Sequence, residues 1–261
     1  MILRFWIFVV ITLCPFTGHT QINNLRFVNF GSKDGLQDKT IYNATQDKQG
    51  YMWFGTGTGL YRYDGLAFKI FRSPVDKPGR TISNILQTVF CDKSGNLWLG
   101  SLNTLQWYDP LKNKFWAPDL QRPEIKNLSD AFILNFTQDK NGDVWIATSN
   151  DYFFQFKILD SAFHSFRNIF PVAASKTTIK IITTVNNGYW AVHSEGIYQF
   201  KTDNKPAGFF PFKDNDISNA FADKDGRSIW LSTYTYGLIR FDCIEKKYET
   251  FDGVNQSLKK K

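Results

Sequence analysis

Hydrophobic and polar residues alternate in short runs along most of this chain, and turn-forming residues separate the runs. Residues 85–91, 105–109 and 133–137 are typical apolar or aromatic runs. Runs this short, bounded by Gly, Asn and Asp, predict β-strands rather than helices. We therefore expect an all-β fold.

One unit of this pattern recurs five times. Each copy has an apolar run, a turn and a second run that carries a tryptophan, namely Trp53, Trp98, Trp145, Trp190 or Trp230. The spacing of these tryptophans, roughly 40–47 residues, is typical of a propeller blade of four strands. Third and fourth runs follow, for example at 60–64 and 68–71. The sequence predicts a β-propeller whose blades cover about 36–71, 82–116, 128–166, 178–212 and 217–251.

The turn before each tryptophan has the form Asp-x-x-Gly. An Asp side chain can cap such a turn, and Gly can adopt its positive φ. These anchor residues are Asp47, Asp92, Asp139 and Asp223 with Gly50, Gly95, Gly142 and Gly226. The fourth copy lacks the Asp, and the fifth has one extra residue before its tryptophan. Because one sheet cannot bury both of its faces, we expect each tryptophan to lie between neighbouring blades.

The ends of the repeat array leave open how the ring closes. Residues 25–30 resemble the outermost strand of a blade, which predicts a ring-closing strand. Residues 255–258 follow the fifth copy and resemble 127–129, which lead into the third. The alternatives are a closed five-bladed ring and an incomplete larger ring, for instance of seven blades. We favour the incomplete ring, with propeller repeats over 21–258.

The N-terminal residues have the pattern of a signal peptide. Arg4 precedes an apolar run at 5–13, and the small residues Gly18 and Thr20 stand before a cut at Gln21. This predicts a signal peptide over 1–20 and an exported, periplasmic protein. The run is too short to span a bilayer, and no later run is longer, so no membrane span is expected in the mature chain.

The charge limits the kinds of binding partner to expect, and the cysteine content bears on disulfide bonds. The net charge is +7, and the basic tail at 259–261 supplies three of these charges. Solubility explains this excess most simply, and an acidic glycan is the alternative. No Lys/Arg cluster marks one element, so we expect no nucleic-acid partner. Cys91 and Cys243 fall in non-adjacent blades, which favours small buried residues over a disulfide.

Residue types for metal or catalytic chemistry are sparse. The two histidines after residue 20, His164 and His193, fall in different blades with no cysteine at metal-ligand spacing. The loop at 139–143 lacks the glycine and distant glutamate of an EF-hand. No nucleophile elbow or phosphate-binding glycine loop is found. We expect no metal, no cofactor and no enzyme activity. A propeller lyase or glycosidase is the least favoured alternative.

The loops between the second and third strands vary most among the copies, and blade symmetry puts them on one face. Sugars bind to exposed aromatic rings combined with polar groups. The candidate ligand-binding residues in these loops are Asn103, Asp151, Tyr152, Glu195, Tyr234 and Tyr236.

The repeats resemble the two-component regulator propeller repeats of bacterial hybrid sensor histidine kinases. The resemblance covers about 25–258 and rests on Asp-x-x-Gly-x-x-Trp followed by Gly-Thr or Gly-Ser, then Gly-Leu-x-x-Tyr-Asp, and on the start Asp34-Gly35-Leu36. It implies a periplasmic sensor that recognises an oligosaccharide released from a glycan. It also implies a homodimer formed through downstream domains, with the kinase outside this chain. A propeller scaffold for protein–protein interaction is the alternative.

Overall fold

The structure is a computed structural model, and it describes residues 28–72, 83–150, 152–167, 178–183, 189–201, 206–223 and 226–251. The chain divides into two compact units, Met1–Phe30 and Gly31–Lys261. The predicted signal peptide, the basic tail and Asp151 lie outside the described residues.

Five four-stranded antiparallel sheets make up the unit Gly31–Lys261, and each is formed by four consecutive strands. We number them blades 1 to 5. Blade 1 contains β1 (Ile41–Gln46), β2 (Met52–Thr56), β3 (Leu60–Tyr63) and β4 (Phe68–Phe71). Blade 2 contains β5 (Thr88–Cys91), β6 (Leu97–Ser101), β7 (Thr104–Asp109) and β8 (Lys114–Trp116). Blade 3 contains β9 (Ile133–Gln138), β10 (Val144–Thr148), β11 (Tyr152–Lys157) and β12 (Ala162–Arg167). Blade 4 contains β13 (Thr178–Thr183), β14 (Tyr189–His193), β15 (Gly196–Phe200) and β16 (Pro206–Pro211). Blade 5 contains β17 (Ile217–Ala222), β18 (Ser228–Thr233), β19 (Leu238–Asp242) and β20 (Lys247–Thr250).

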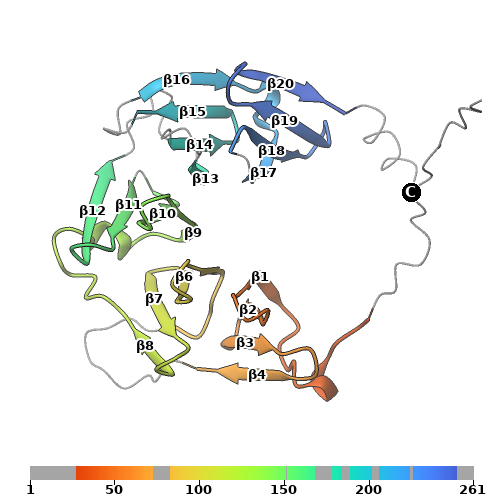
Figure 1. Cartoon of the computed structure of the whole chain (residues 1–261), viewed down its shortest axis with the longest axis vertical. Coiled ribbons are helices and arrows are strands. Elements are labelled where there is room, and N and C mark those ends of the chain that lie inside the picture. The colour runs from red at the N-terminus through yellow and green to blue at the C-terminus, as the bar shows by residue number, and fades with distance from the viewer. Residues whose placement is uncertain are drawn as a thin grey trace, which may run out of the picture. The chain divides into compact units, whose positions relative to one another are not determined.

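The blades stand side by side in chain order (Figure 1). The first strand of each blade, such as β1, β9, β13 and β17, lies toward the centre in Figure 1, and the fourth strand lies on the outside. This is the arrangement of a β-propeller, so the predicted fold class is confirmed. No helix among the described residues is both long and apolar enough to cross a membrane.

The segment predicted as a ring-closing strand is only partly described. Val28 and Phe30 are exposed and lie outside any strand. Residues 25–27 lie outside the described residues, so the ring-closing strand stays a prediction.

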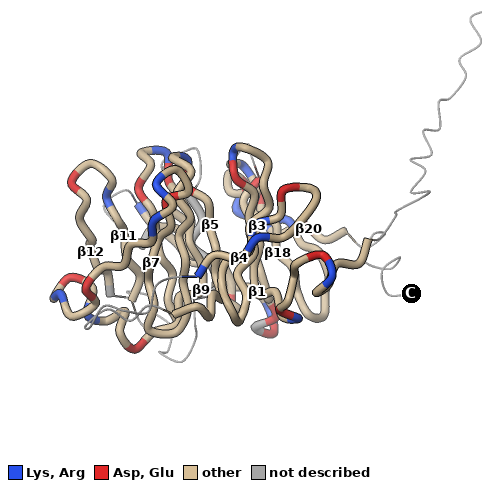
Figure 2. Tube along the Cα trace, turned by 90° about the horizontal axis from the view of Figure 1, so that it is seen from below, with Lys and Arg blue, Asp and Glu red and all other residues tan. Residues whose placement is uncertain are grey.

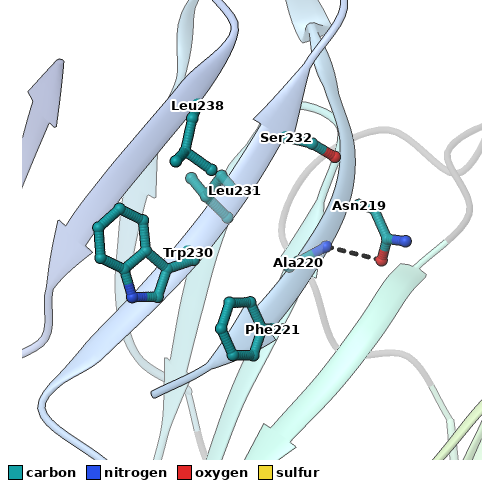
Figure 3. Close-up of a pocket in the computed structure, with 7 residues that line it drawn as sticks. All are labelled: Asn219, Ala220, Phe221, Trp230, Leu231, Ser232 and Leu238. Carbon is teal, nitrogen blue, oxygen red and sulfur yellow. Dashed lines mark hydrogen bonds between the residues drawn. The ribbon is translucent and has the colours of Figure 1, made fainter. Parts of the chain in front are cut away.

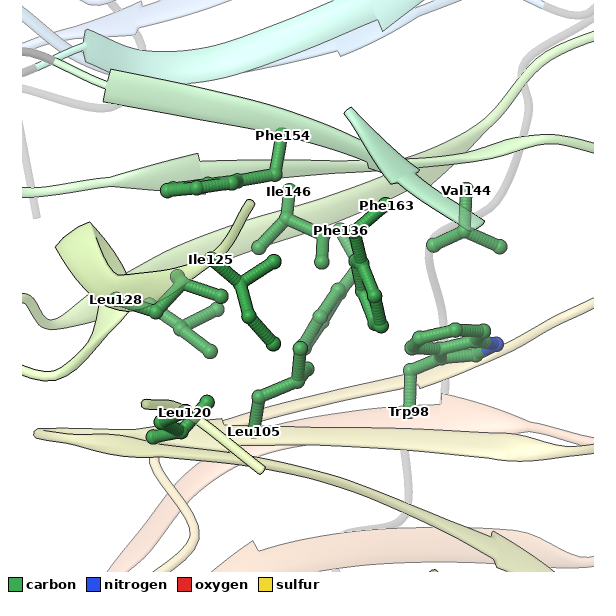
Figure 4. Packing of buried hydrophobic residues seen from close by; sticks show 11 residues of the cluster. Trp98, Leu105, Leu120, Ile125, Leu128, Phe136, Val144, Ile146, Phe154 and Phe163 are labelled. Atoms are coloured by element: carbon green, nitrogen blue, oxygen red, sulfur yellow. The ribbon is translucent and has the colours of Figure 1, made fainter. Parts of the chain in front are cut away.

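Each of blades 1 to 4 packs the face that carries its tryptophan against the next blade. Between blades 2 and 3, Trp98 meets Phe136, Val144 and Ile146, all of which are buried (Figure 4). The connection that follows β8 adds Leu120, Ile125 and Leu128 to the same cluster. Corresponding clusters surround Trp53 between blades 1 and 2 and Trp190 between blades 4 and 5. The hydrophobic core is therefore a series of layers between blades.

Blades 1 and 2 approach each other closely at Gly55, because glycine has no side chain. A Cβ atom at Gly55 would lie 2.5 Å from the carbonyl oxygen of Leu86. The next residue, Thr56, accepts a hydrogen bond of 2.8 Å from the backbone N–H of Leu86. This contact also explains why β5 begins at Thr88, although the apolar run predicts a strand from residue 85: the backbone of Leu86 pairs with blade 1 instead.

Trp230 differs from the other four tryptophans. Trp53, Trp98, Trp145 and Trp190 are 1% to 3% exposed, whereas Trp230 is only half-buried. Its neighbours on the same face, Phe221 and Leu238, are 56% and 37% exposed. The expected burial between two blades is thus wrong for Trp230, because the described residues include no blade that covers this face.

We predict that truncation of Trp98 and of Trp230 will have unequal costs. Trp98→Ala removes a ring enclosed by two blades and is expected to lower the free energy of unfolding by ~3–5 kcal/mol. Trp230→Ala should cost about 1–2 kcal/mol, since much of this ring already contacts water. Urea unfolding of the two variants measures the difference. Equal losses would contradict the packing described here.

Candidate functional site

One carboxylate organises each Asp-x-x-Gly turn and also holds the tryptophan that follows. In blade 2, Oδ1 of Asp92 accepts the backbone N–H groups of Ser94 and Asn96 at 2.8 and 2.9 Å. Its Oδ2 accepts the indole N–H of Trp98 at 2.9 Å. Gly95 completes the turn with φ of 91°, where a side chain would be strained. The carboxylate therefore fixes both the turn and the ring that packs on the next blade.

The same bond recurs in three other blades. The indole N–H donates to the turn aspartate from Trp53 to Asp47 at 2.6 Å, from Trp145 to Asp139 at 3.0 Å, and from Trp230 to Asp223 at 3.3 Å. The extra residue of blade 5 lengthens the bond without breaking it. The sequence analysis assigned the aspartates to the turns alone. The constant six-residue spacing from Asp to Trp in the first three copies is the sequence signal that could have revealed the second role.

The second-to-third-strand loops lie at the opposite end of the blades from these turns, because the strands are antiparallel. The predicted residues of these loops that the structure describes come from four different blades. Asn103 is in blade 2, Tyr152 in blade 3, Glu195 in blade 4, and Tyr234 and Tyr236 in blade 5. Tyr152 is part of β11 and packs against the core between blades 2 and 3. It is a structural residue more than a ligand-facing one.

Tyr234 has the most open position of these candidates. Its side chain is 83% exposed. The loop beneath it is fixed by the buried Asp216, whose carboxylate accepts the backbone N–H of Thr235 at 2.8 Å and its hydroxyl at 3.0 Å. Burial alone would raise the pKa of Asp216, but these hydrogen bonds hold it below its ordinary value. The buried carboxylate thus fixes the backbone next to Tyr234 and so the point from which its exposed ring projects.

The neighbouring Tyr236 is held by two charged residues that sequence reasoning missed. Its hydroxyl donates to Asp214, which raises the pKa of the phenol. The ammonium of Lys213 lies 3.8 Å from its ring centroid. Both residues belong to the short 3₁₀ helix η3 (Lys213–Asn215), which precedes β17. We define the Tyr234 loop as Tyr234, Thr235 and Tyr236 with Lys213, Asp214 and Asp216 as its support.

The uncovered face of blade 5 contains a separate, shallow pocket of about 190 Å³ (Figure 3). Phe221 and Trp230 form its apolar wall, and Leu238 and Ser232 line it further along the strands. In blades 1 to 4, the next blade along the chain covers the corresponding face. Its chemistry fits another apolar surface better than a polar small molecule.

Charged residues lie mainly on the turns at the two ends of the blades, with both signs mixed (Figure 2). No group of three or more metal-ligating side chains occurs in the described part of the chain. His164 belongs to β12, where it lies 4.0 Å from Asp160, and His193 is buried in β14.

Two groups at the blade interfaces have strongly raised pKa values. Burial, with a further contribution from the charge of Asp92, raises the pKa of the Cys91 thiol to about 11. Burial and the nearby charge of Asp139 raise the pKa of Tyr189 to about 12. Tyr189 also donates a hydrogen bond to Asp139 at 3.3 Å. Cys91 and Cys243 are half-buried and form no disulfide.

Comparisons with known proteins agree with this repeat architecture. The model of the family described as "Two component regulator propeller" matches residues 35–58 and 127–150, which confirms the resemblance of the repeats. A curated relative, "Histidine kinase P4" of Formosa agariphila, is 42% identical over 53 residues, or 20% of this chain and 4% of that protein. The matched segment is thus a small part of a much longer protein.

Two solved structures share the fold. Both are extracellular domains described as belonging to hybrid two-component systems of B. thetaiotaomicron. One has a TM-score of 0.71 and 22% identity, over 85% of this chain and 31% of that one. The other has a TM-score of 0.61 and 18% identity, over 83% and 28%. This chain therefore spans about a third of the length of these domains.

We predict that Asp92→Asn will destabilise the fold although it retains an acceptor oxygen for the turn. The asparagine NH₂ group cannot accept the indole N–H of Trp98, which is left unpaired in a buried position. The expected cost is ~1–3 kcal/mol in the free energy of unfolding, measured in urea. Asp119→Asn is the matched control, because Asp119 is exposed and caps a turn without an indole partner. Equal stability of wild type and Asp92→Asn would contradict the dual role.

Stability should also fall in alkaline solution. The pKa of Cys91 is raised from 9.0 to about 11, so the folded state retains the thiol proton where the unfolded state has lost it. Its contribution is fully present below about pH 9 and is lost as pH rises towards 11. Melting temperatures between pH 8 and 11 measure this decline. Cys91→Ala should make this decline shallower, while Tyr189, whose pKa is also raised, still contributes at the alkaline end. An identical slope in Cys91→Ala would rule out this contribution.

Proposed function

We propose that this chain, which carries two-component regulator propeller repeats, is an extracellular ligand-sensing module of a hybrid two-component system. The observation that carries this proposal is the shared fold: 85% of the chain superposes on an extracellular domain described as part of such a system. The predicted signal peptide supports export to the periplasm. Signalling itself would belong to other parts of such a system.

We further propose that the ligand is a glycan-derived oligosaccharide. The Tyr234 loop supports this choice, because it combines an 83% exposed aromatic ring with hydroxyl and carboxylate groups. Aromatic faces pack on sugar rings, and fixed polar groups select among hydroxyl arrangements. Because the buried Asp216 already holds this loop, the loop loses little conformational entropy when the ligand binds.

Sensing requires more than binding. A ligand changes the conformation of a receptor only if it binds one arrangement more tightly than another. The blades are rigid layers, so the difference must arise where a blade face or loop meets another domain. Dimerisation through further domains, predicted from the family resemblance, is one such arrangement and remains part of the proposal.

Protein–protein interaction is a second candidate function, favoured by one observation. The face of blade 5 formed by Phe221, Trp230 and Leu238 is apolar and uncovered in the described residues. A chain that binds no sugar, but whose association with envelope proteins is lost on Phe221→Ser, would support this alternative instead.

Titration calorimetry with a panel of neutral and acidic oligosaccharides tests the proposed function. We expect at least one oligosaccharide to bind, and we expect Tyr234→Ala to weaken that binding at least about tenfold, or ~1.4 kcal/mol. Tyr42→Ala is the matched control, because Tyr42 is also exposed but lies on β1. Absence of heat with every sugar would contradict the glycan proposal. Full affinity in Tyr234→Ala would remove the Tyr234 loop from it.

A further inference from the structure

Blade 1 places an arginine at a position where blades 2, 3 and 4 have other side chains. Arg62 on β3 is paired in register with Trp53 on β2. The residues in the corresponding register position of blades 2 to 5 are Trp107, Gln155, Gln199 and Arg240. This position faces the interface with the next blade, because it lies beside the tryptophan. The repeat itself therefore does not require arginine here.

Aromatic rings surround the guanidinium of Arg62. Its central carbon lies 4.5 Å from the ring centroid of Tyr51 and 5.8 Å from those of Trp53 and Phe71. Such rings stabilise a cation and orient its planar face, but they leave its N–H groups without acceptors. The aromatic surroundings thus hold the charge in place without neutralising it.

No carboxylate is bonded to Arg62 in the described residues. Its Nε atom is buried and lacks a hydrogen-bond partner. The equivalent Arg240 of blade 5 is fully engaged: it donates to Ser228 at 2.9 Å and forms ion pairs with Glu249 at 3.2 Å and Asp242 at 3.5 Å. Buried polar groups almost always have partners, and an exception calls for an explanation. The contrast with Arg240 indicates that Arg62 is kept for an external partner.

Arg62 also lines a pocket of about 310 Å³ between blades 1 and 2, at the end of the blades that carries the Asp-x-x-Gly turns. Its volume is at the lower end of the range for small-molecule sites, ~300–1,000 Å³. Tyr51 and Trp53 provide aromatic surface, and Gln49, Ser94 and Asn96 provide polar groups. This pocket is distinct from the Tyr234 loop. That loop belongs to blade 5 and lies at the opposite end of the blades from the Asp-x-x-Gly turns.

The two acidic side chains in the pocket wall are already engaged. Asp47 accepts the N–H groups of Gln49 and Tyr51 and the indole N–H of Trp53. Asp109 forms an ion pair of 3.1 Å with Lys112 and caps the turn before β8. Arg62 is therefore the charged group of this wall that forms neither a hydrogen bond nor an ion pair in the described residues.

We propose that this pocket binds the carboxylate of an acidic sugar through Arg62, with Tyr51 against the sugar ring. Guanidinium groups bind carboxylates through paired, charge-assisted hydrogen bonds. The polar residues of the two neighbouring turns would contact the sugar hydroxyls. The sugar part of this inference rests on the proposed function, and the carboxylate part rests on Arg62 and the pocket alone.

Calorimetry with the full chain and three probes tests this site. The probes are a trimer of galacturonic acid, the corresponding neutral galactose trimer, and tartrate as a carboxylate without a sugar ring. We expect the acidic trimer to bind wild type at least about tenfold more tightly than the neutral trimer does. Arg62→Gln should remove that preference, whereas the matched variant Arg240→Gln should retain it. Arg62→Lys should recover only part of it, because lysine cannot form the paired bonds.

The outcomes separate this inference from the proposed function. Equal binding of the acidic and neutral trimers, or full affinity in a folded Arg62→Gln protein, would overturn the carboxylate site and leave glycan sensing intact. Arg62-dependent binding of tartrate without any sugar binding would support the site and count against glycan sensing. Absence of binding by all three probes would overturn the carboxylate site. Thermal melting of each variant checks that it is folded.

Discussion

The structure depends on one short-range interaction: a buried carboxylate that accepts an indole N–H. In blade 2, Asp92 closes the turn between β5 and β6 and at the same time fixes Trp98. The ring it holds becomes the surface on which the next blade packs. A local bond within one hairpin thereby determines contacts between residues about 40 positions apart. Loss of the carboxylate would disturb the turn, the indole and the interface together.

This arrangement makes each blade depend on its successor, as in other repeat proteins. Trp53 and Trp98 are buried because blades 2 and 3 cover them. Trp230 has the same bond to its aspartate, yet it remains half-exposed. The indole bond is thus a property of the single blade, while burial of the ring is a property of the pair. The apolar face around Trp230 follows from this difference and does not by itself indicate a ligand site.

The regular part of the fold could be predicted from the sequence, because each blade repeats the same local chemistry. Short apolar runs, turn glycines and five tryptophans were sufficient to identify the propeller. The irregular contacts could not be predicted. Leu120 and Ile125 lie in a connection without any repeat, yet they fill the interface of blades 2 and 3. For the candidate loops, the sequence identified aromatic residues but could not distinguish the exposed Tyr234 from Tyr152, which packs on the core. Exposure depends on neighbours that are distant in the chain.

The functional specificity of a repeated scaffold must come from positions where the repeats differ. The tryptophan recurs in all five blades and the turn aspartate in four of them, where they serve the turns and interfaces, so they cannot distinguish one ligand from another. The position beside the tryptophan is different in kind: it holds an unpaired arginine in blade 1, a tryptophan in blade 2 and a paired arginine in blade 5. An arginine without a counter-ion costs stability where it stands. Because Trp107 packs against Trp98 at the same position, an apolar ring can fill this place, and packing alone does not explain Arg62. An anionic ligand would supply the missing partner, and the cost would then be recovered on binding.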